Sequence, residues 1–122
     1  MRFNWLHYLD LAQELCEQAE NSGHRDANLR SSISRAYYAT YHKSQQLLKD
    51  KWGIVTSKDS HSHQQVQDEF NKQDQKEIAE YLHVMRRNRN NADYRDKYRN
   101  IEEAAQANIL LARQVLSDLS RL

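Results

Sequence analysis

Apolar residues recur along the chain at steps of three and four, the spacing that puts side chains on one face of an α-helix. This pattern predicts helices over about residues 4–20 and 26–51, and a short helix over about 61–71. A fourth helix is expected from near Asp74 and a last one from about Asn100. Polar residues occupy the opposite faces, so each helix can bury one stripe and needs neighbours to be stable in water.

The predicted helix ends carry ordinary stop and start signals. Asn21-Ser22-Gly23 closes the first helix, Gly53 closes the second, and Glu77 suits a capping box that starts at Asp74. The expected buried stripes are Trp5, Tyr8, Ala12, Leu15 and Ala19; Leu29, Ile33, Ala36, Thr40, Ser44 and Leu47; Val66 and Phe70; Ile78, Leu82 and Met85; Ile101, Ala105, Asn108, Ala112, Val115, Leu119 and Leu122. Together these elements predict an all-α fold, an antiparallel up-down four-helix bundle with a short additional helix between the second and fourth helices. Residues 1–122 are expected to form a single domain.

Composition supports this class of fold and narrows the cellular setting. The chain has two glycines and no proline, too few for the turns of a sheet protein. One cysteine, Cys16, excludes an internal disulfide and fits a reducing compartment. No apolar run approaches the roughly 20 residues of a membrane span, and MRFNWLHYLDLAQ lacks a signal-peptide core. We therefore expect a cytoplasmic protein without a membrane partner.

Charge is unevenly distributed although the formal net charge is only +1. Residues 86–99 hold six cations against two carboxylates, a local net charge of +4. Such a patch can attract phosphate even on a nearly neutral protein. It is equally consistent with a solvated basic helix end, which the helix dipole favours.

The apolar stripe of the fourth helix is interrupted by Arg89, where another core residue would be expected. Asp93 follows at the spacing of an ion pair, which by itself could simply close the bundle. The alternative is a polar groove, in which Arg89 binds a phosphate while Asn90 and Tyr94 hydrogen-bond or stack on a nucleotide. Asn90 is a weak helix former, which either indicates a task for its side chain or marks the end of the helix.

Three residues of the second helix, Arg35, Tyr38 and His42, share a face that could meet the same groove. His42 would then supply an imidazole, or it is simply a hydrogen-bonded histidine on a half-buried face. The tyrosines of this helix can stack on bases, although tyrosines at helical spacing are more often core residues.

Metal binding has little support in the sequence. Glu80-Tyr-Leu-His83 has the spacing of a di-iron helix, but no second copy of the motif exists. His61 and His63 lack a third ligand nearby and are expected to be solvated. We expect no metal and no cofactor, and a four-helix metal carrier is the weakest alternative function.

Two segments resemble the HEPN family of helical-bundle proteins. Arg30-Ser-Ser-Ile-Ser-Arg-Ala-Tyr-Tyr-Ala-Thr-Tyr-His42 is similar to the family's second-helix signature, and Met85-Arg-Arg-Asn-Arg-Asn-Asn-Ala-Asp-Tyr94 to its fourth-helix motif. The likeness is closest to a small subgroup with Arg-x-x-Ala-Asp-Tyr. The order of helices and the chain length also agree, so the resemblance extends over nearly the whole chain.

The resemblance implies an RNA-binding homodimer, and many family members are metal-independent endoribonucleases of toxin–antitoxin or antiviral defence systems. Arg89 and Asn90 match the start of the family's catalytic motif, but Tyr94 stands where a histidine is expected. A tyrosine with its ordinary pKa near about 10 is a poor base at neutral pH. Enzymatic activity is therefore left open, with Arg89, Asn90 and Tyr94 as the catalytic candidates and Asp93 as support for Arg89.

Two further expectations follow from the resemblance. A cognate nucleotidyltransferase or antitoxin is an expected partner, and Tyr94 or Tyr98 is a candidate acceptor for a transferred nucleotide. The alternative function is a non-catalytic interaction module that binds such a partner protein.

Overall fold

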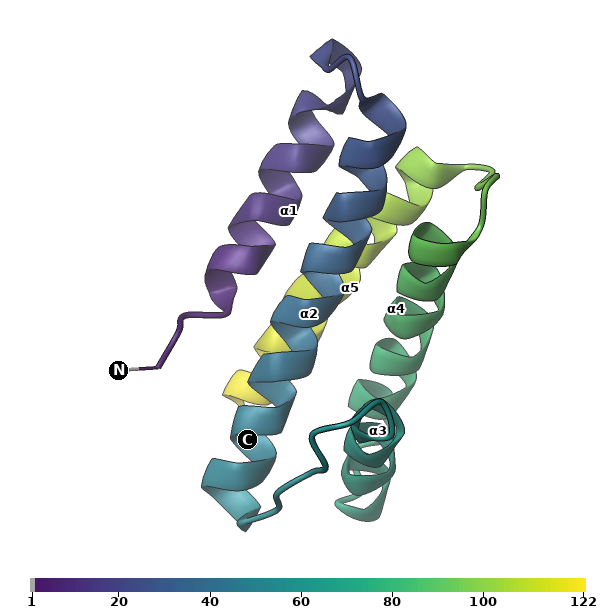
Figure 1. The fold of residues 1–122 in the computed structure, drawn as a ribbon. Coiled ribbons are helices and arrows are strands. Elements are labelled where there is room, and N and C mark those ends of the chain that lie inside the picture. Colours follow the sequence, from purple (N-terminus) through teal and green to yellow (C-terminus); the bar gives the residue numbers. More distant parts are fainter. Residues whose placement is uncertain (1) are drawn as a thin grey trace.

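A computed structural model describes residues 2–122 and shows an all-α bundle. Its helices are α1 (Leu6–Gln18), α2 (Arg25–Trp52), α3 (Ser62–Lys72), α4 (Lys76–Tyr94) and α5 (Ile101–Ser120), with a 3₁₀ turn, η1 (Ala19–Asn21), after α1. Within this described range there is no strand. The chain reverses direction from one long helix to the next, and α3 lies against α4 (Figure 1). The all-α prediction and its five helical stretches are confirmed.

The end of α2 follows the sequence signal. Gly53 has a φ of 66°, a left-handed conformation that glycine adopts without steric cost. Its N–H bonds back to the carbonyl groups of Leu48 and Lys49, which closes the helix. Gly53 is thus the C-cap of α2, as the sequence predicted.

The start of α4 differs from the prediction. The helix begins at Lys76, and its N-terminus has no side-chain cap. Asp74 instead has a φ of 59° in the turn that ends α3, where the N–H of Gln75 donates to the carbonyl of Phe70 at 2.8 Å. Aspartate tolerates the left-handed conformation better than most residues. Asp74 therefore forms part of the turn between α3 and α4 and does not cap the N-terminus of α4.

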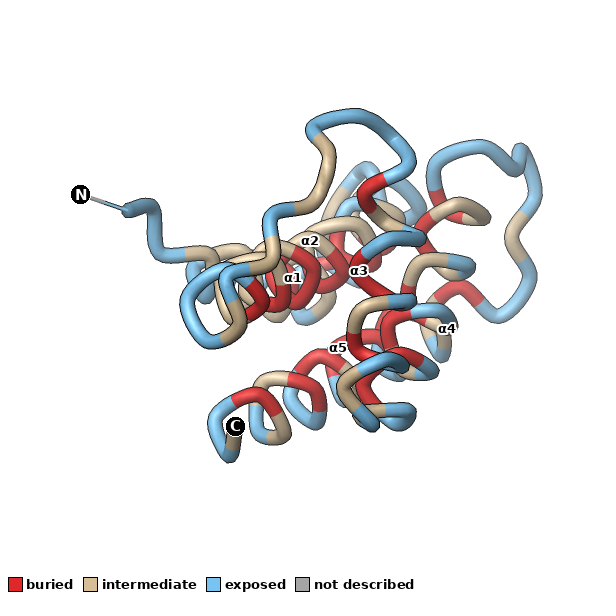
Figure 2. The backbone as a smooth tube through the Cα atoms, turned by 90° about the horizontal axis from the view of Figure 1, so that it is seen from below, coloured by how far each residue is buried: buried red, intermediate tan, exposed pale blue. Residues whose placement is uncertain are grey.

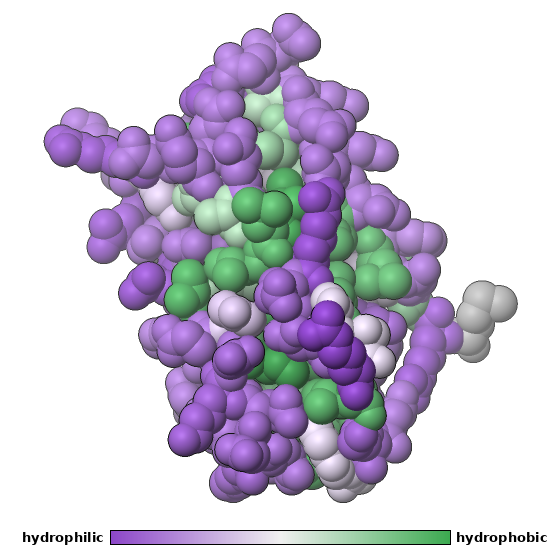
Figure 3. Space-filling view, turned by 180° about the vertical axis from the view of Figure 1, so that it is seen from behind, coloured by the Kyte–Doolittle hydropathy of each residue, from purple (hydrophilic) through white to green (hydrophobic). Residues whose placement is uncertain are grey.

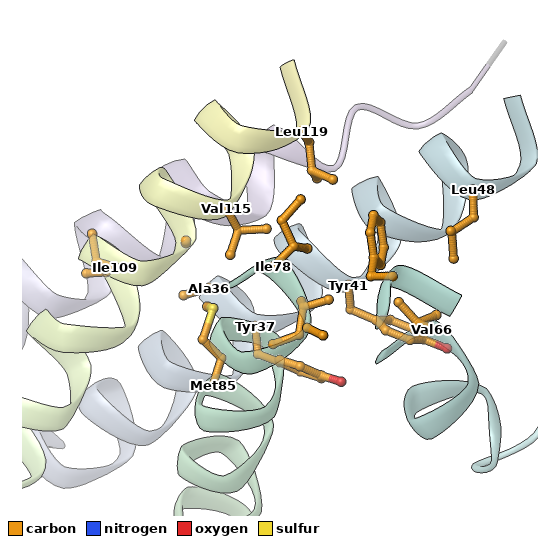
Figure 4. Packing of buried hydrophobic residues seen from close by; sticks show 14 of the residues in the cluster. Ala36, Tyr37, Tyr41, Leu48, Val66, Ile78, Met85, Ile109, Val115 and Leu119 are labelled. Atoms are coloured by element: carbon orange, nitrogen blue, oxygen red, sulfur yellow. The ribbon is translucent and has the colours of Figure 1, made fainter. Parts of the chain in front are cut away.

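α2 is the central helix, since it contacts each of the other helices. Buried residues lie on the inner faces of the helices and exposed residues on the outer faces and connections (Figure 2). Figure 4 shows Tyr37, Leu48, Met85 and Val115 in the main core, with side chains from α2, α4 and α5 converging.

Most predicted stripe residues are buried, and the exceptions lie toward the edges of the bundle. The half-buried exceptions are Trp5, Tyr8, Leu15, Leu47 and Leu122. Leu48, not Leu47, reaches the centre of the core at that level of α2. The buried position is therefore shifted by one residue along α2. Packing against the neighbouring helices, and not the periodicity of the sequence, decides which of the two leucines is buried.

Two polar bridges tie α4 to its neighbours. Asn108 of α5 is fully buried, accepts a hydrogen bond from Asn88 at 2.8 Å and donates to the carbonyl of Ile33 at 3.3 Å. Arg30 of α2 donates to the carbonyl of Ala92 at 2.8 Å and to that of Asp96 at 3.0 Å, which satisfies acceptors left free where α4 ends. Both bridges fix the segment of α4 that carries Arg89.

The rear face of the bundle carries apolar side chains between polar borders (Figure 3). An apolar cavity of about 650 Å³ opens between Leu6, Leu47, Leu116, Leu119 and Leu122. None of the described helices is both long and apolar enough to cross a membrane.

Replacing Leu48 by alanine should lower the free energy of unfolding by about 2–5 kcal/mol, because it removes a side chain that is 0% exposed and leaves a cavity. Leu110 is the matched control, since it is 64% exposed and its replacement should cost no more than about 0.5 kcal/mol. Urea unfolding of both variants measures the difference, and equal losses would contradict the assigned core.

Candidate functional site

Arg89, on the inner face of α4, is the charged residue at the centre of the site. Its Cζ lies 5.5 Å from the ring centroids of both Tyr37 and Tyr38 on α2, a distance at which aromatic rings attract a cation. Its Nη1 lies 3.5 Å from Oδ2 of Asp93, so the predicted ion pair is present. Arg89 is only 9% exposed. The guanidinium is therefore held between α2 and α4 and reaches solvent along a narrow margin.

Arg86 lies one helical turn before Arg89 and shares an unusual property with it. The Nε atoms of both residues are buried and have no hydrogen-bond partner among residues 2–122. An unpaired buried donor costs about 1–3 kcal/mol, so such groups are rare in folded proteins. Both guanidinium groups are thus incompletely paired within residues 2–122, although their Nε atoms are themselves shielded from solvent.

His63 on α3 belongs to the same cluster. Its Nδ1 lies 2.6 Å from the hydroxyl oxygen of Tyr37, and its ring stacks on that of Tyr41 with centroids 4.2 Å apart. Burial lowers the pKa of His63 to about 4, and the positive charges of Arg86 and Arg89 act in the same direction. The imidazole is therefore neutral at pH 7.

The expectation that both histidines of the His61-Ser-His63 segment are solvated is wrong for His63. His61 is exposed, whereas His63 is half-buried. The sequence held a usable signal, because His63 precedes Val66 and Phe70 at helical steps of three and four. It lies on the apolar face of α3, and a count of metal ligands alone could not show this.

His42 is fixed by neighbours on two sides. Its ring stacks on Trp5 with centroids 3.7 Å apart, and its Nδ1 lies 3.2 Å from Oε1 of Gln45. Gln45 in turn donates through Nε2 to the hydroxyl groups of Tyr41 at 2.9 Å and Thr56 at 3.0 Å. Burial lowers the pKa of His42 below its ordinary value. His42 is therefore a second neutral imidazole with a defined orientation.

The three predicted supporting residues of α2 have different environments. Tyr38 contacts Arg89, and the ring of His42 lies 5.9 Å from that of Tyr38. Arg35 instead lies over the ring of Tyr8 on α1, with Cζ 4.9 Å from the centroid. Tyr38 and His42 thus join the cluster around Arg89, while Arg35 packs toward α1.

A polar cavity of about 450 Å³ lies beside this cluster, between α2, α3 and the connection that joins them. Its size is within the range of small-ligand sites. Both neutral imidazoles line it, together with hydroxyl, amide and charged groups. The lining residues are Tyr41, His42, Gln45, Thr56, Ser57, Lys58, Asp59, Ser60, Ser62 and His63.

Tyr94 and Asn90 do not join the cluster in the way that Arg89 does. Tyr94 is the last residue of α4 and is 78% exposed. Asn90 is half-buried, as is Tyr98, which packs against a small apolar group at the end of α4. The predicted catalytic residues therefore differ in burial. The guanidinium of Arg89 is buried, whereas the phenol of Tyr94 is exposed to solvent.

No family model, curated protein or solved structure matches the chain. Among residues 2–122 no three histidine, cysteine, aspartate or glutamate side chains lie close enough to hold a metal ion.

The buried imidazole should make the fold sensitive to acid. Unfolding lets the pKa of His63 rise from about 4 toward its ordinary 6.5, so the unfolded chain binds more protons between these pH values. The contribution of the neutral His63 ring to the free energy of unfolding is fully present above pH 6.5. It falls as the pH is lowered toward 4. Lowering the pH from 7 to 5 should therefore shift the urea midpoint of wild type downward, and less in His63→Gln.

His83→Gln is the control for this experiment, because it introduces the same glutamine in place of an exposed histidine of α4. It should keep the wild-type response to acid. His42 retains part of the response in every variant, since its pKa is also lowered. An undiminished response in His63→Gln would show that the ring titrates like a solvated one.

Proposed function

We propose that this chain is an HEPN-like domain that binds RNA as a homodimer and cleaves it without a metal ion. We further propose that residues 1–122 form a single domain. In it α1, α2, α4 and α5 form an up-down four-helix bundle, and α3 is an additional short helix. The setting we propose is a toxin–antitoxin or antiviral defence system.

One observation carries the proposal, namely the two neighbouring guanidinium groups of Arg86 and Arg89, which are incompletely paired within residues 2–122. They lie near aromatic rings and a neutral imidazole. Guanidinium groups bind phosphate through planar, charge-assisted hydrogen bonds, and tyrosine rings stack on unpaired bases. A single-stranded polyanion with flat bases offers both kinds of partner in one molecule.

The individual roles follow from the environments of the predicted residues. Arg89 holds a phosphate, Asp93 keeps its guanidinium in place, and Asn90 orients the bound group. Tyr94, at 78% exposure, is accessible to a second copy of the chain and to the RNA that it binds. The same exposure makes Tyr94 a better acceptor than the half-buried Tyr98 for a nucleotide added by a cognate nucleotidyltransferase.

Replacing Arg89 by lysine should lower the rate of RNA cleavage about 100-fold, because it keeps the charge and removes the planar set of donors. Lysine is chosen over alanine because the residue is largely buried. Incubation of purified wild-type and variant protein with tRNA or total RNA, without metal, measures the rate. Arg121→Lys, on a side chain that is 73% exposed at the far end of α5, should cleave as wild type does. Cleavage that survives Arg89→Lys at the wild-type rate contradicts the role of Arg89.

The same fold also suits a non-catalytic interaction module, which we propose as the alternative function. The observation in its favour is the separation of Arg89, which is 9% exposed, from Tyr94, which is 78% exposed. Arg89 would then serve as an internal link between α2 and α4. Tyr94 would lie on the surface that binds a partner such as a nucleotidyltransferase or an antitoxin.

Replacing Tyr94 by histidine separates the two functions. If the natural chain is a non-catalytic module, an imidazole at this position should create ribonuclease activity that wild type lacks, since it can transfer protons near neutral pH. If wild type is already a nuclease that uses Tyr94, Tyr94→His should change the pH dependence of an existing activity. Tyr94→Phe is the matched control, because it keeps the ring and removes the ionisable group.

A further inference from the structure

Two histidines line the cavity between α2, α3 and residues 53–61. Their hydrogen-bond partners place the ring hydrogen on Nδ1 in one histidine and on Nε2 in the other. His42 faces the amide oxygen of Gln45 through Nδ1 at 3.2 Å. Gln45 uses its amide nitrogen to donate to Tyr41 and Thr56, so its oxygen can only accept. The hydrogen of the neutral His42 ring is therefore on Nδ1, and its Nε2 presents a free lone pair.

His63 has the complementary arrangement. Its Nδ1 lies 2.6 Å from the hydroxyl oxygen of Tyr37. Among residues 2–122 the hydroxyl of the buried Tyr37 has no other hydrogen-bond partner, so its hydrogen is directed to Nδ1 of His63. The hydrogen of the neutral His63 ring is then on Nε2. One cavity is thus lined by an imidazole from α2 that can accept a proton at Nε2 and an imidazole from α3 that can donate one from Nε2.

From this geometry we infer that the cavity lined by His42 and His63 is the place where an RNA phosphodiester is cleaved, with His42 as the proton acceptor and His63 as a hydrogen-bond donor to the phosphate. The inference rests on the proposed function and moves the proton-transfer chemistry from Tyr94 to these two rings. At about 450 Å³ the cavity has room for a nucleotide-sized group.

The reaction balances without a further reagent. The ribose 2′-oxygen forms a bond to phosphorus while its proton moves to Nε2 of His42. The bond between phosphorus and the 5′-oxygen breaks, and the proton passes from Nε2 to that oxygen. Nε2–H of His63 donates to a non-bridging phosphate oxygen, where negative charge grows. The products are a 2′,3′-cyclic phosphate and a 5′-hydroxyl end, and His42 is neutral again.

The positions of the two arginines fit this assignment. Arg86 and Arg89 lie near enough to His63 for their charges to act on its ring. Neither arginine lines the cavity itself, so they act on a bound phosphate only as positive charges near the His63 ring, while the donor and acceptor come from uncharged rings. Lys58 and Asp59 also line the cavity, both exposed, so the cation on its solvent side has a carboxylate beside it.

The test uses two replacements at each histidine, in the full chain and without metal. Glutamine keeps a polar side chain, and phenylalanine keeps a flat ring for the stacks on Trp5 and Tyr41. A labelled single-stranded RNA is the substrate, and a strand with 2′-deoxyribose throughout is its uncleavable counterpart. Affinity is measured by fluorescence anisotropy, the cleavage rate by single-turnover assays, and the new ends by mass spectrometry.

Both His42 variants should lose at least about 100-fold in cleavage rate, as removal of a general base does. Both His63 variants should lose at least about tenfold, as removal of one phosphate donor does. Affinity for the deoxy strand should stay within about twofold of wild type, and the RNA product should end in a cyclic phosphate. His83→Gln, an exposed histidine outside the cavity, should cleave at the wild-type rate.

The other outcomes separate this inference from the proposed function. Cleavage by wild type that persists in the folded His42 and His63 variants overturns the inference and leaves the proposed function in place. RNA binding by wild type without cleavage overturns the inference and leaves a binding module. Failure of wild type to bind RNA overturns the proposed function, and the inference with it.

Discussion

A cation in the interior of a small helical bundle must be compensated, and in this protein the compensation organises the space between α2 and α4. The guanidinium of Arg89 lies over Tyr37 and Tyr38, with Asp93 at the edge of ion-pair distance. An isolated charge moved from water into an apolar core would cost far more than a small domain can provide. Rings that attract cations and a nearby carboxylate make the position tolerable, so the tyrosines of α2 are as necessary to the site as the arginine itself.

This arrangement has a consequence for the other polar groups nearby. Tyr37 contacts Arg89 with its ring and His63 with its hydroxyl, and thereby links the cation to the imidazole. Figure 4 shows Tyr37 and Tyr41 projecting from α2 in the same direction, with both hydroxyl groups at the edge of the apolar core. The rings contribute to the core while their hydroxyl groups find hydrogen-bond partners at its edge, as buried tyrosines usually do, and Tyr41 also lines the cavity. The short helix α3 is therefore more than a connection, because it supplies the imidazole that the Tyr37 hydroxyl and the Tyr41 ring hold in place.

The fixed position of α4 depends on contacts from α2 and α5 that lie outside the site. Arg30 bonds to carbonyl groups where α4 ends, and Asn88 reaches the buried Asn108. Arg30 also pairs with Asp26 at 2.7 Å, so its guanidinium is held from both sides. The Asn88–Asn108 bridge satisfies buried polar atoms, and Arg30 satisfies carbonyl groups at the more exposed end of α4. Together they help to position the turn of α4 that carries Arg86 and Arg89 against the tyrosines.

Periodicity determined the helices and most of their buried faces, because the step of three and four residues is a local property of each segment. It also identified Arg89 as an anomaly and Asp93 as its partner, since both lie on one helix. It could not show that His63 meets Tyr37, or that Arg35 packs toward Tyr8 instead of the site. Those outcomes depend on how far each helix is rotated and shifted against its neighbours, which is set by the packing of all five together. The sequence therefore identified Arg89, Tyr38 and His42 as candidates, and only the tertiary structure showed that His63 lies beside them, because the neighbours of a side chain depend on how the helices pack.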